Sequence, residues 1–169
     1  ELVSTICPVP ITINKDYFIP SFVNHQTLFI VSSYSGNTEE TLSAMNQAIE
    51  KKAQIVCVTS GGKILDLAKQ HQFEFIEIPG GMPPRSCIGY SLVQLIKIFV
   101  TKNLAPSSLI DEVISSIKLL EDKAEEIKTD ALHIAKQLHN KICVIYTLGT
   151  CEGVAVRFRQ QINENSKDL

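Results

Sequence analysis

Apolar runs of strand length alternate with amphipathic helical patterns in the first half of the chain, and this alternation constrains the fold more than any other feature. The runs lie at residues 27–31, 54–59 and 73–78. Between them, residues 39–52 and 64–71 place apolar side chains on one stripe of a helix. Nearly continuous apolar strands are buried on both faces, and strands joined by helices pair in parallel through right-handed crossovers. The sequence therefore predicts an α/β fold, a doubly wound parallel sheet between two layers of helices.

Further segments extend this pattern on both sides. Short apolar runs predict two more strands, at residues 10–13 and 141–146. Amphipathic patterns predict four more helices, at residues 87–100, 107–120, 121–138 and 152–162. We therefore expect three parts: a domain at 1–103, a helical linker at 104–140 and the beginning of a second α/β domain at 141–169.

Composition excludes several classes of function. The 169 residues carry a net charge of −2, so no general attraction to nucleic acid or to an anionic membrane is expected. The chain contains no apolar run of membrane-spanning length and opens with no signal segment, and we expect it to be cytoplasmic. Its five cysteines and four histidines show no paired-ligand spacing, so we expect neither a disulfide framework nor a metal site.

A loop rich in hydroxyls directly follows the apolar run 27–31 and directly precedes a helical segment. Its side chains are short donors, its glycine permits close backbone approach, and the helix that follows offers unpaired N–H groups at a positive dipole end. The Gly-Lys-Ser/Thr signature of a nucleotide P-loop is absent. We predict a phosphate site that needs no lysine, formed by Ser33, Ser35, Gly36, Asn37 and Thr38.

Simple capping is an alternative explanation for the same loop. Thr38 or Ser35 could cap the helix, with Glu39 or Glu40 facing its dipole. Capping and anion binding are compatible.

Residues 59–63, Thr-Ser-Gly-Gly-Lys, fit two interpretations equally well: a second anion site, or a turn in which Ser60 caps the next helix.

Arg85 lies in a proline-rich loop at residues 79–86 that leads into the apolar helix. Prolines before a helix fix the path of the chain and would hold Arg85 near the helix start. A cation opposes the dipole there, so we expect an anion to compensate it. The alternative is a solvated arginine in a surface loop.

Glu164 lies between Asn163 and Asn165 near the C-terminal end of the chain. A carboxylate whose orientation is set by its neighbours suits a proton-abstracting base. The alternative is an ordinary helix C-terminus with polar capping residues and Asn165 in a left-handed conformation.

Taken together, these motifs resemble those of the bifunctional phosphoglucose/phosphomannose isomerases of bacteria and archaea, which contain two sugar isomerase (SIS) domains. The match spans nearly the whole chain and is weakest at residues 107–139. It rests on the ordered set Ser-Tyr-Ser-Gly-Asn-Thr-Glu-Glu-Thr (33–41), Thr-Ser-Gly-Gly-Lys (59–63), Ile-Pro-Gly-Gly-Met-Pro-Pro-Arg (78–85), Gly-Tyr-Ser (89–91) and Asn-Glu-Asn-Ser-Lys (163–167).

The resemblance implies the reversible isomerisation of glucose 6-phosphate or mannose 6-phosphate to fructose 6-phosphate. By this resemblance, Ser33, Ser35 and Thr38 hold the sugar phosphate. Arg85 stabilises the charge of the enediolate, and Glu164 moves the proton between C1 and C2. The resemblance implies no metal or organic cofactor, and it implies a homodimer.

The chain also departs from the family. Members carry a glycine-rich turn upstream of the matching region, and a histidine and a lysine downstream, which this chain lacks. It also begins without methionine. We therefore expect a fragment that lacks the first strand and helix of its first SIS domain and has little or no activity alone.

A second function from another class fits part of the pattern. SIS modules can bind sugar phosphates without catalysis, as sensors or regulators. Such a module should lack the Asn-Glu-Asn signature around Glu164 and should lie near a basic helix-turn-helix. The chain shows the signature and no such helix-turn-helix, which favours the enzyme.

Overall fold

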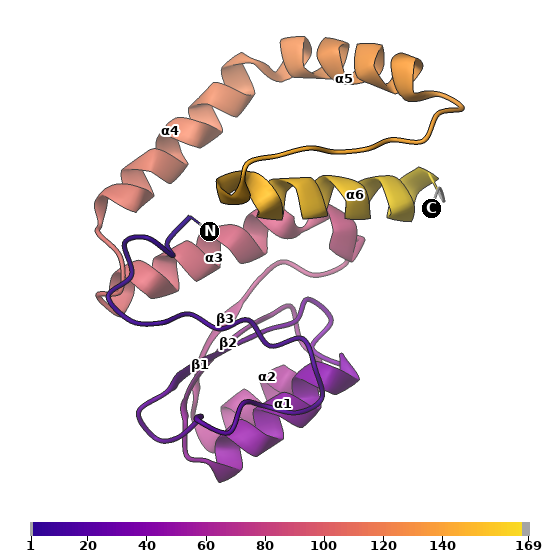
Figure 1. The fold of residues 1–169 in the computed structure, drawn as a ribbon. Coiled ribbons are helices and arrows are strands. Elements are labelled where there is room, and N and C mark those ends of the chain that lie inside the picture. Colours follow the sequence, from indigo (N-terminus) through magenta and orange to yellow (C-terminus); the bar gives the residue numbers. More distant parts are fainter. Residues whose placement is uncertain (1, 167–169) are drawn as a thin grey trace. The chain divides into compact units, whose positions relative to one another are not determined.

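The computed structural model describes residues 2–166, which divide into two compact units. Val9–Lys102 form one unit, called here the sheet unit. The described residues of the other, 2–8 and 103–166, are called the helical unit. Figure 1 shows the elements of both.

Three parallel strands form the sheet, and strands adjacent in the sheet are consecutive in the sequence. They are β1 (Leu28–Ser32), β2 (Gln54–Thr59) and β3 (Glu74–Glu77), in the order β1-β2-β3. Helices α1 (Glu39–Glu50) and α2 (Gly62–His71) connect them (Figure 1). The predicted α/β fold with a parallel sheet is confirmed, because the three apolar runs form strands and each strand pairs in parallel with the next one in the sequence.

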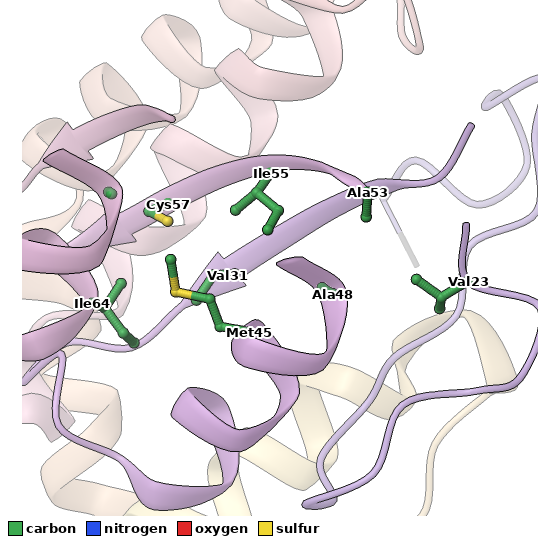
Figure 2. Close-up of a cluster of buried hydrophobic side chains, with 9 residues drawn as sticks. Val23, Val31, Met45, Ala48, Ala53, Ile55, Cys57 and Ile64 are labelled. Carbon is green, nitrogen blue, oxygen red and sulfur yellow. The ribbon is translucent and has the colours of Figure 1, made fainter. Parts of the chain in front are cut away.

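Helices α1 and α2 cover one face of the sheet. Every second residue of β2 points to this face, and Ile55 and Cys57 contribute to a buried cluster there. Met45 of α1 and Ile64 of α2 are fully buried in the same cluster (Figure 2). Burying a side chain of this size contributes about 1.5–3 kcal/mol, so the amphipathic stripes of the two helices anchor them to the sheet.

Helix α3 (Ile88–Thr101) covers the opposite face (Figure 1). The alternate residues of β2, Val56 and Val58, are buried with Ile98 of α3 in a second cluster. Both faces of β2 are therefore covered, which explains why this strand is apolar at nearly every position.

The helical unit consists mainly of α4 (Ser108–Asp122), α5 (Ala124–Leu138) and α6 (Glu152–Ser166). The predicted helices are present, and α4 and α5 are separated at Lys123. None of the residues described in these helices is buried. Across residues 2–166, we find no helix with the length and apolar character needed to cross a membrane.

Two predicted strands are wrong. Residues 10–13 and 141–146 have strand-like sequences but form no strand in the structure. Pro8 and Pro10 remove two backbone donors near the first segment. In the second, Ile142 is 93% exposed. A β-strand is stable only when another strand satisfies its backbone groups, and no described strand pairs with either segment.

Candidate functional site

Three loops meet at the carboxyl edge of the sheet, where parallel α/β folds bind ligands. They are the β1–α1 loop (33–38), the β2–α2 loop (60–61) and the β3–α3 loop (78–87). Tyr34 joins all three: its carbonyl accepts a hydrogen bond from the Ser60 N–H at 3.0 Å, and its hydroxyl accepts one from the Met82 N–H at 3.1 Å. The structure therefore gathers the predicted phosphate loop and the Arg85 loop at one edge.

The β1–α1 loop is closed by its own hydroxyls. The Ser33 and Thr38 hydroxyl oxygens are 2.9 Å apart, and the Asn37 N–H donates to Ser35 Oγ at 3.2 Å. Ser33 is buried, whereas Ser35, Asn37 and Thr38 are exposed. A ligand arriving from solvent would therefore meet the last three side chains first.

The first turn of α1 is left uncapped by side chains. Thr38 occupies the N-cap position, but its side chain makes no hydrogen bond to the helix; it pairs with Ser33 instead. The N–H groups of a first helical turn have no partner within the helix, so they can bind an anion. Glu39 and Glu40, also in this turn, offset part of the helix dipole. The capping alternative is thus right about the position of Thr38 and wrong about its side chain.

Gly36 is required by the contact between the β1–α1 and β2–α2 loops. Its φ is +66°, and a Cβ at this position would lie 1.8 Å from the Gly61 carbonyl oxygen. Gly62 meets the β1–α1 loop in the same way, because its Cβ would lie 2.5 Å from the Ser35 carbonyl oxygen at a φ of +70°. The two loops pack backbone to backbone, which side chains would prevent.

The start of α2 is closed by the β1–α1 loop. The Lys63 N–H donates to Asn37 Oδ1 at 3.1 Å, and the Ile64 N–H donates to the Gly36 carbonyl at 3.0 Å. Ser60 does not cap α2, as one alternative held; its hydroxyl donates to the Tyr34 carbonyl at 2.6 Å. The β2–α2 loop therefore supports the β1–α1 loop, and these two amides of α2 are already engaged.

Arg85 lies in a short 3₁₀ turn, η1 (Pro84–Ser86), just before α3. The Pro83 carbonyl closes this turn by accepting hydrogen bonds from the Ser86 N–H, the Ser86 hydroxyl and the Cys87 thiol, at 2.9, 2.8 and 3.3 Å. Arg85 is exposed. As predicted, prolines lead the chain into α3 with Arg85 near its start.

Glu164 belongs to α6 in the helical unit and is exposed. The side-chain amide of Asn165 donates to the Gln161 carbonyl at 2.8 Å. The alternative with Asn165 in a left-handed conformation is wrong, because α6 continues through Ser166 and Asn165 has no positive φ. Lys167, the last residue of the predicted motif, lies outside the described residues.

Tyr34 is the residue that the sequence analysis did not single out. Its hydrogen bond with the Cys87 side chain is the main cause that raises its pKa above the ordinary value; a hydrogen bond with the Met82 backbone acts in the opposite direction. The available signal was an aromatic residue in a loop otherwise made of small polar residues.

Metal-ligating side chains do not cluster in the part of the chain that the structure describes. Residues 2–166 contain no group of three or more His, Cys, Asp or Glu side chains able to hold a metal ion. All five cysteines are free. Burial raises the pKa of Cys57, a residue of β2, to about 11.

Known proteins match this chain over nearly its whole length. The bifunctional phosphoglucose/phosphomannose isomerase of Caldicellulosiruptor bescii is 41% identical over 169 residues, covering 95% of this chain and 50% of that protein. The chain is a homologue of these isomerases. The enzyme of the same name from Thermoplasma volcanium is 39% identical over 160 residues, with the same two shares. The resemblance seen in the sequence motifs is confirmed.

Other comparisons refine this relationship. The family described as the bacterial phospho-glucose isomerase C-terminal SIS domain matches residues 127–169. The D-glucosamine-6-phosphate 4-epimerase of Sulfolobus acidocaldarius is 30% identical over 149 residues, which cover 86% of this chain and 46% of that protein. No solved structure matches. The chain spans about half the length of the curated relatives it matches, and the domain boundaries at 103 and 140 stay a prediction.

Proposed function

We propose that this chain is part of an isomerase that interconverts glucose 6-phosphate or mannose 6-phosphate with fructose 6-phosphate. The observation that carries the proposal is its 41% identity, over 95% of its length, to a phosphoglucose/phosphomannose isomerase. Because the chain spans half of that relative, the activity is proposed for the complete protein. The chain alone is expected to have little or none.

In this proposal the β1–α1 loop binds the phosphate of the sugar. Ser35, Asn37 and Thr38 are exposed at the uncapped start of α1, and Gly36 lets the backbone turn there with a φ of +66°. Ser33 is buried and holds the Thr38 hydroxyl at 2.9 Å. The loop thus offers hydroxyls and backbone N–H groups, which together suit a doubly charged phosphate ester.

The chemistry is assigned to Arg85 and Glu164. The Glu164 carboxylate takes a proton from C2 of the open-chain aldose to give the enediolate, and it returns the proton to C1 while the hydroxyl proton of O2 passes to O1, which gives the ketose. Arg85 stabilises the negative charge that develops on the oxygens. The two residues lie in different units. No metal or organic cofactor takes part in the proposed reaction.

Replacing Glu164 by glutamine in the complete protein tests this assignment. Glu164→Gln removes the proton acceptor and keeps the size of the side chain, so isomerase activity should fall by about 10²–10⁴-fold. Affinity for hexose 6-phosphate, measured by calorimetry, should be nearly unchanged. Glu152→Gln, in the same helix, is the matched control and should retain activity. Full activity in Glu164→Gln would rule out this role.

Epimerisation of an amino-sugar phosphate is a second candidate, favoured by the Sulfolobus relative. Analysis of products by NMR distinguishes the two reactions. The proposed isomerase converts glucose 6-phosphate to fructose 6-phosphate, whereas an epimerase would convert glucosamine 6-phosphate to its C4 epimer. A sugar-phosphate-binding module without catalysis would bind hexose phosphate and produce neither.

A homodimer and a cytoplasmic location complete the proposal. Helix α3 exposes Ile88, Tyr90 and Leu92, each more than 40% accessible, and so offers apolar surface to a second copy. Light scattering of the complete protein would give its oligomeric state.

A further inference from the structure

Tyr34 contacts all three loops of the carboxyl edge, and no role follows for it from the phosphate loop alone. Its ring packs beside the cluster formed by Val56, Val58, Ile78 and Ile98, which lies between the sheet and α3. Its carbonyl accepts hydrogen bonds from both the backbone and the side chain of Ser60. The ring and backbone of Tyr34 are therefore held from two directions.

The hydroxyl of Tyr34 reaches both sides of the turn that carries Arg85. It accepts a hydrogen bond from the Met82 N–H at 3.1 Å, before η1, and the Cys87 side chain, after η1, is the main cause that raises the pKa of Tyr34. The Cys87 thiol in turn donates to the Pro83 carbonyl at 3.3 Å. The Tyr34 hydroxyl is therefore bonded to the chain just before the turn, and Cys87 just after the turn influences it.

The chemistry of these groups supports a fixed arrangement. Cys87 is 2% exposed, so few waters can compete for its sulfur. The hydrogen bond with Cys87 favours the protonated hydroxyl, as the raised pKa of Tyr34 indicates. A protonated hydroxyl can donate to Cys87 while it accepts from Met82. Without the hydroxyl, both of these contacts to the Arg85 turn would be lost at once.

We infer that Tyr34 is a positioning residue, which holds the turn carrying Arg85 at a fixed place relative to the β1–α1 loop. Its catalytic consequence rests on the proposed function: the phosphate loop orients the sugar, and Tyr34 sets where Arg85 meets it. Tyr34 itself need not touch the substrate. Small displacements of a charge-stabilising group are costly to catalysis, so the link is sensitive to the loss of one oxygen atom.

Hydrogen exchange of the 169-residue chain tests the tether without any activity. Tyr34→Phe removes the hydroxyl and keeps the ring that packs on the core. The Met82 amide loses its acceptor and should exchange about tenfold faster, whereas amides of β1 and β2 should be unchanged. Tyr146→Phe, at a side chain 92% exposed, is the matched control. It should leave the exchange rates of Met82 and of the β1 and β2 amides unchanged. Unchanged exchange at Met82 in Tyr34→Phe would overturn the inference.

Kinetics of the complete protein test the consequence for Arg85. Tyr34→Phe should lower kcat by about ten- to a hundredfold, with KM nearly unchanged, because substrate binding is kept and only the placement of Arg85 is lost. If Tyr34 acts through Arg85, adding Tyr34→Phe to Arg85→Ala should cost less than about twofold further. Additive losses would show that Tyr34 acts independently of Arg85 and would overturn its positioning role.

The hydrogen-exchange and kinetic experiments together distinguish failure of this inference from failure of the proposed function. A wild-type protein without isomerase activity would refute the proposed function, while the exchange at Met82 would still decide whether Tyr34 holds the turn. An active protein in which Tyr34→Phe loosens Met82 but leaves kcat intact would refute the inference alone. If Tyr34→Phe speeds exchange at Met82, lowers kcat and causes no further loss when added to Arg85→Ala, the results support both the inference and the proposed function.

Discussion

The β1–α1 and β2–α2 loops look alike in sequence and differ in what they can bind. Both follow a strand of the sheet, both contain glycine and hydroxyl residues, and both lead into a helix. At the start of α1, the Thr38 side chain leaves the helix uncapped. At the start of α2, the Lys63 and Ile64 amides are taken up by Asn37 and Gly36 of the other loop.

The difference shows that one loop can occupy the helix N–H groups that would otherwise be open at the end of another. The Gly36 carbonyl and the Asn37 side chain accept hydrogen bonds from α2, and the Ser33 and Thr38 hydroxyls pair with each other at the start of α1. The β2–α2 loop therefore supports the β1–α1 loop. A composition of serine, threonine and glycine predicts a tight turn in both cases, but only the contacts decide which turn stays open to a ligand.

Replacing Gly36 by alanine should have the largest effect on this pair of loops. A Cβ at Gly36 would lie 1.8 Å from the Gly61 carbonyl oxygen, so Gly36→Ala must separate the loops and should cost about 3 kcal/mol or more of unfolding free energy. Urea unfolding measures this cost. Gly81→Ala is the control: its φ of +83° is similar but no atom lies within 4 Å, so it should cost only about 1–2 kcal/mol. Equal losses would mean that the loops are not packed as described.

The serines of the two loops should differ in their effect on binding. Ser35→Ala removes an exposed hydroxyl of the proposed phosphate site and should weaken hexose 6-phosphate binding by about 1.5–3 kcal/mol. Ser60→Ala removes a hydroxyl that donates to the Tyr34 carbonyl, and it should change affinity much less. Calorimetry on the complete protein compares them. If Ser60→Ala weakened binding more than Ser35→Ala, the assignment of site and support would be reversed.

A smaller effect is expected at the contact that closes α2. Asn37→Ala leaves the Lys63 N–H without its 3.1 Å acceptor. Because Lys63 is exposed and water can replace the acceptor, the cost in unfolding free energy should be about 0.5–1.5 kcal/mol. Asn37→Asp retains an acceptor and should keep most of the stability. A loss in Asn37→Asp as large as in Asn37→Ala would show that this hydrogen bond contributes little.

The sheet was the most predictable part of the fold. Each strand of the sheet is a short apolar run next to an amphipathic helix, so local pattern and tertiary packing agree. Residues 141–146 show the limit of this reasoning. They have the same strand-like composition, yet Ile142 and Tyr146 are more than 90% exposed, because the described chain offers no neighbouring strand.

The place of the candidate loop between a strand and a helix was predictable, and the hydrogen bonds that join it to the other loops were not. Ser33, Ser35 and Thr38 were identified by their position between a strand and a helix. Tyr34 was missed, because its hydroxyl partner Met82 is 48 residues away in the sequence. No periodicity within one segment reports such a contact.

From the sequence alone came the parallel α/β sheet, the kinship with sugar-phosphate isomerases and the choice of candidate phosphate residues, because these depend on local pattern and on motifs in order. The tertiary structure alone decided that the β2–α2 loop supports the β1–α1 loop, that Gly36 has no room for a side chain, and that the Tyr34 hydroxyl accepts a hydrogen bond from Met82, beside the Arg85 turn. The physical reason is that hydrogen bonds and steric contacts between loops arise only when the sheet brings the ends of its strands together.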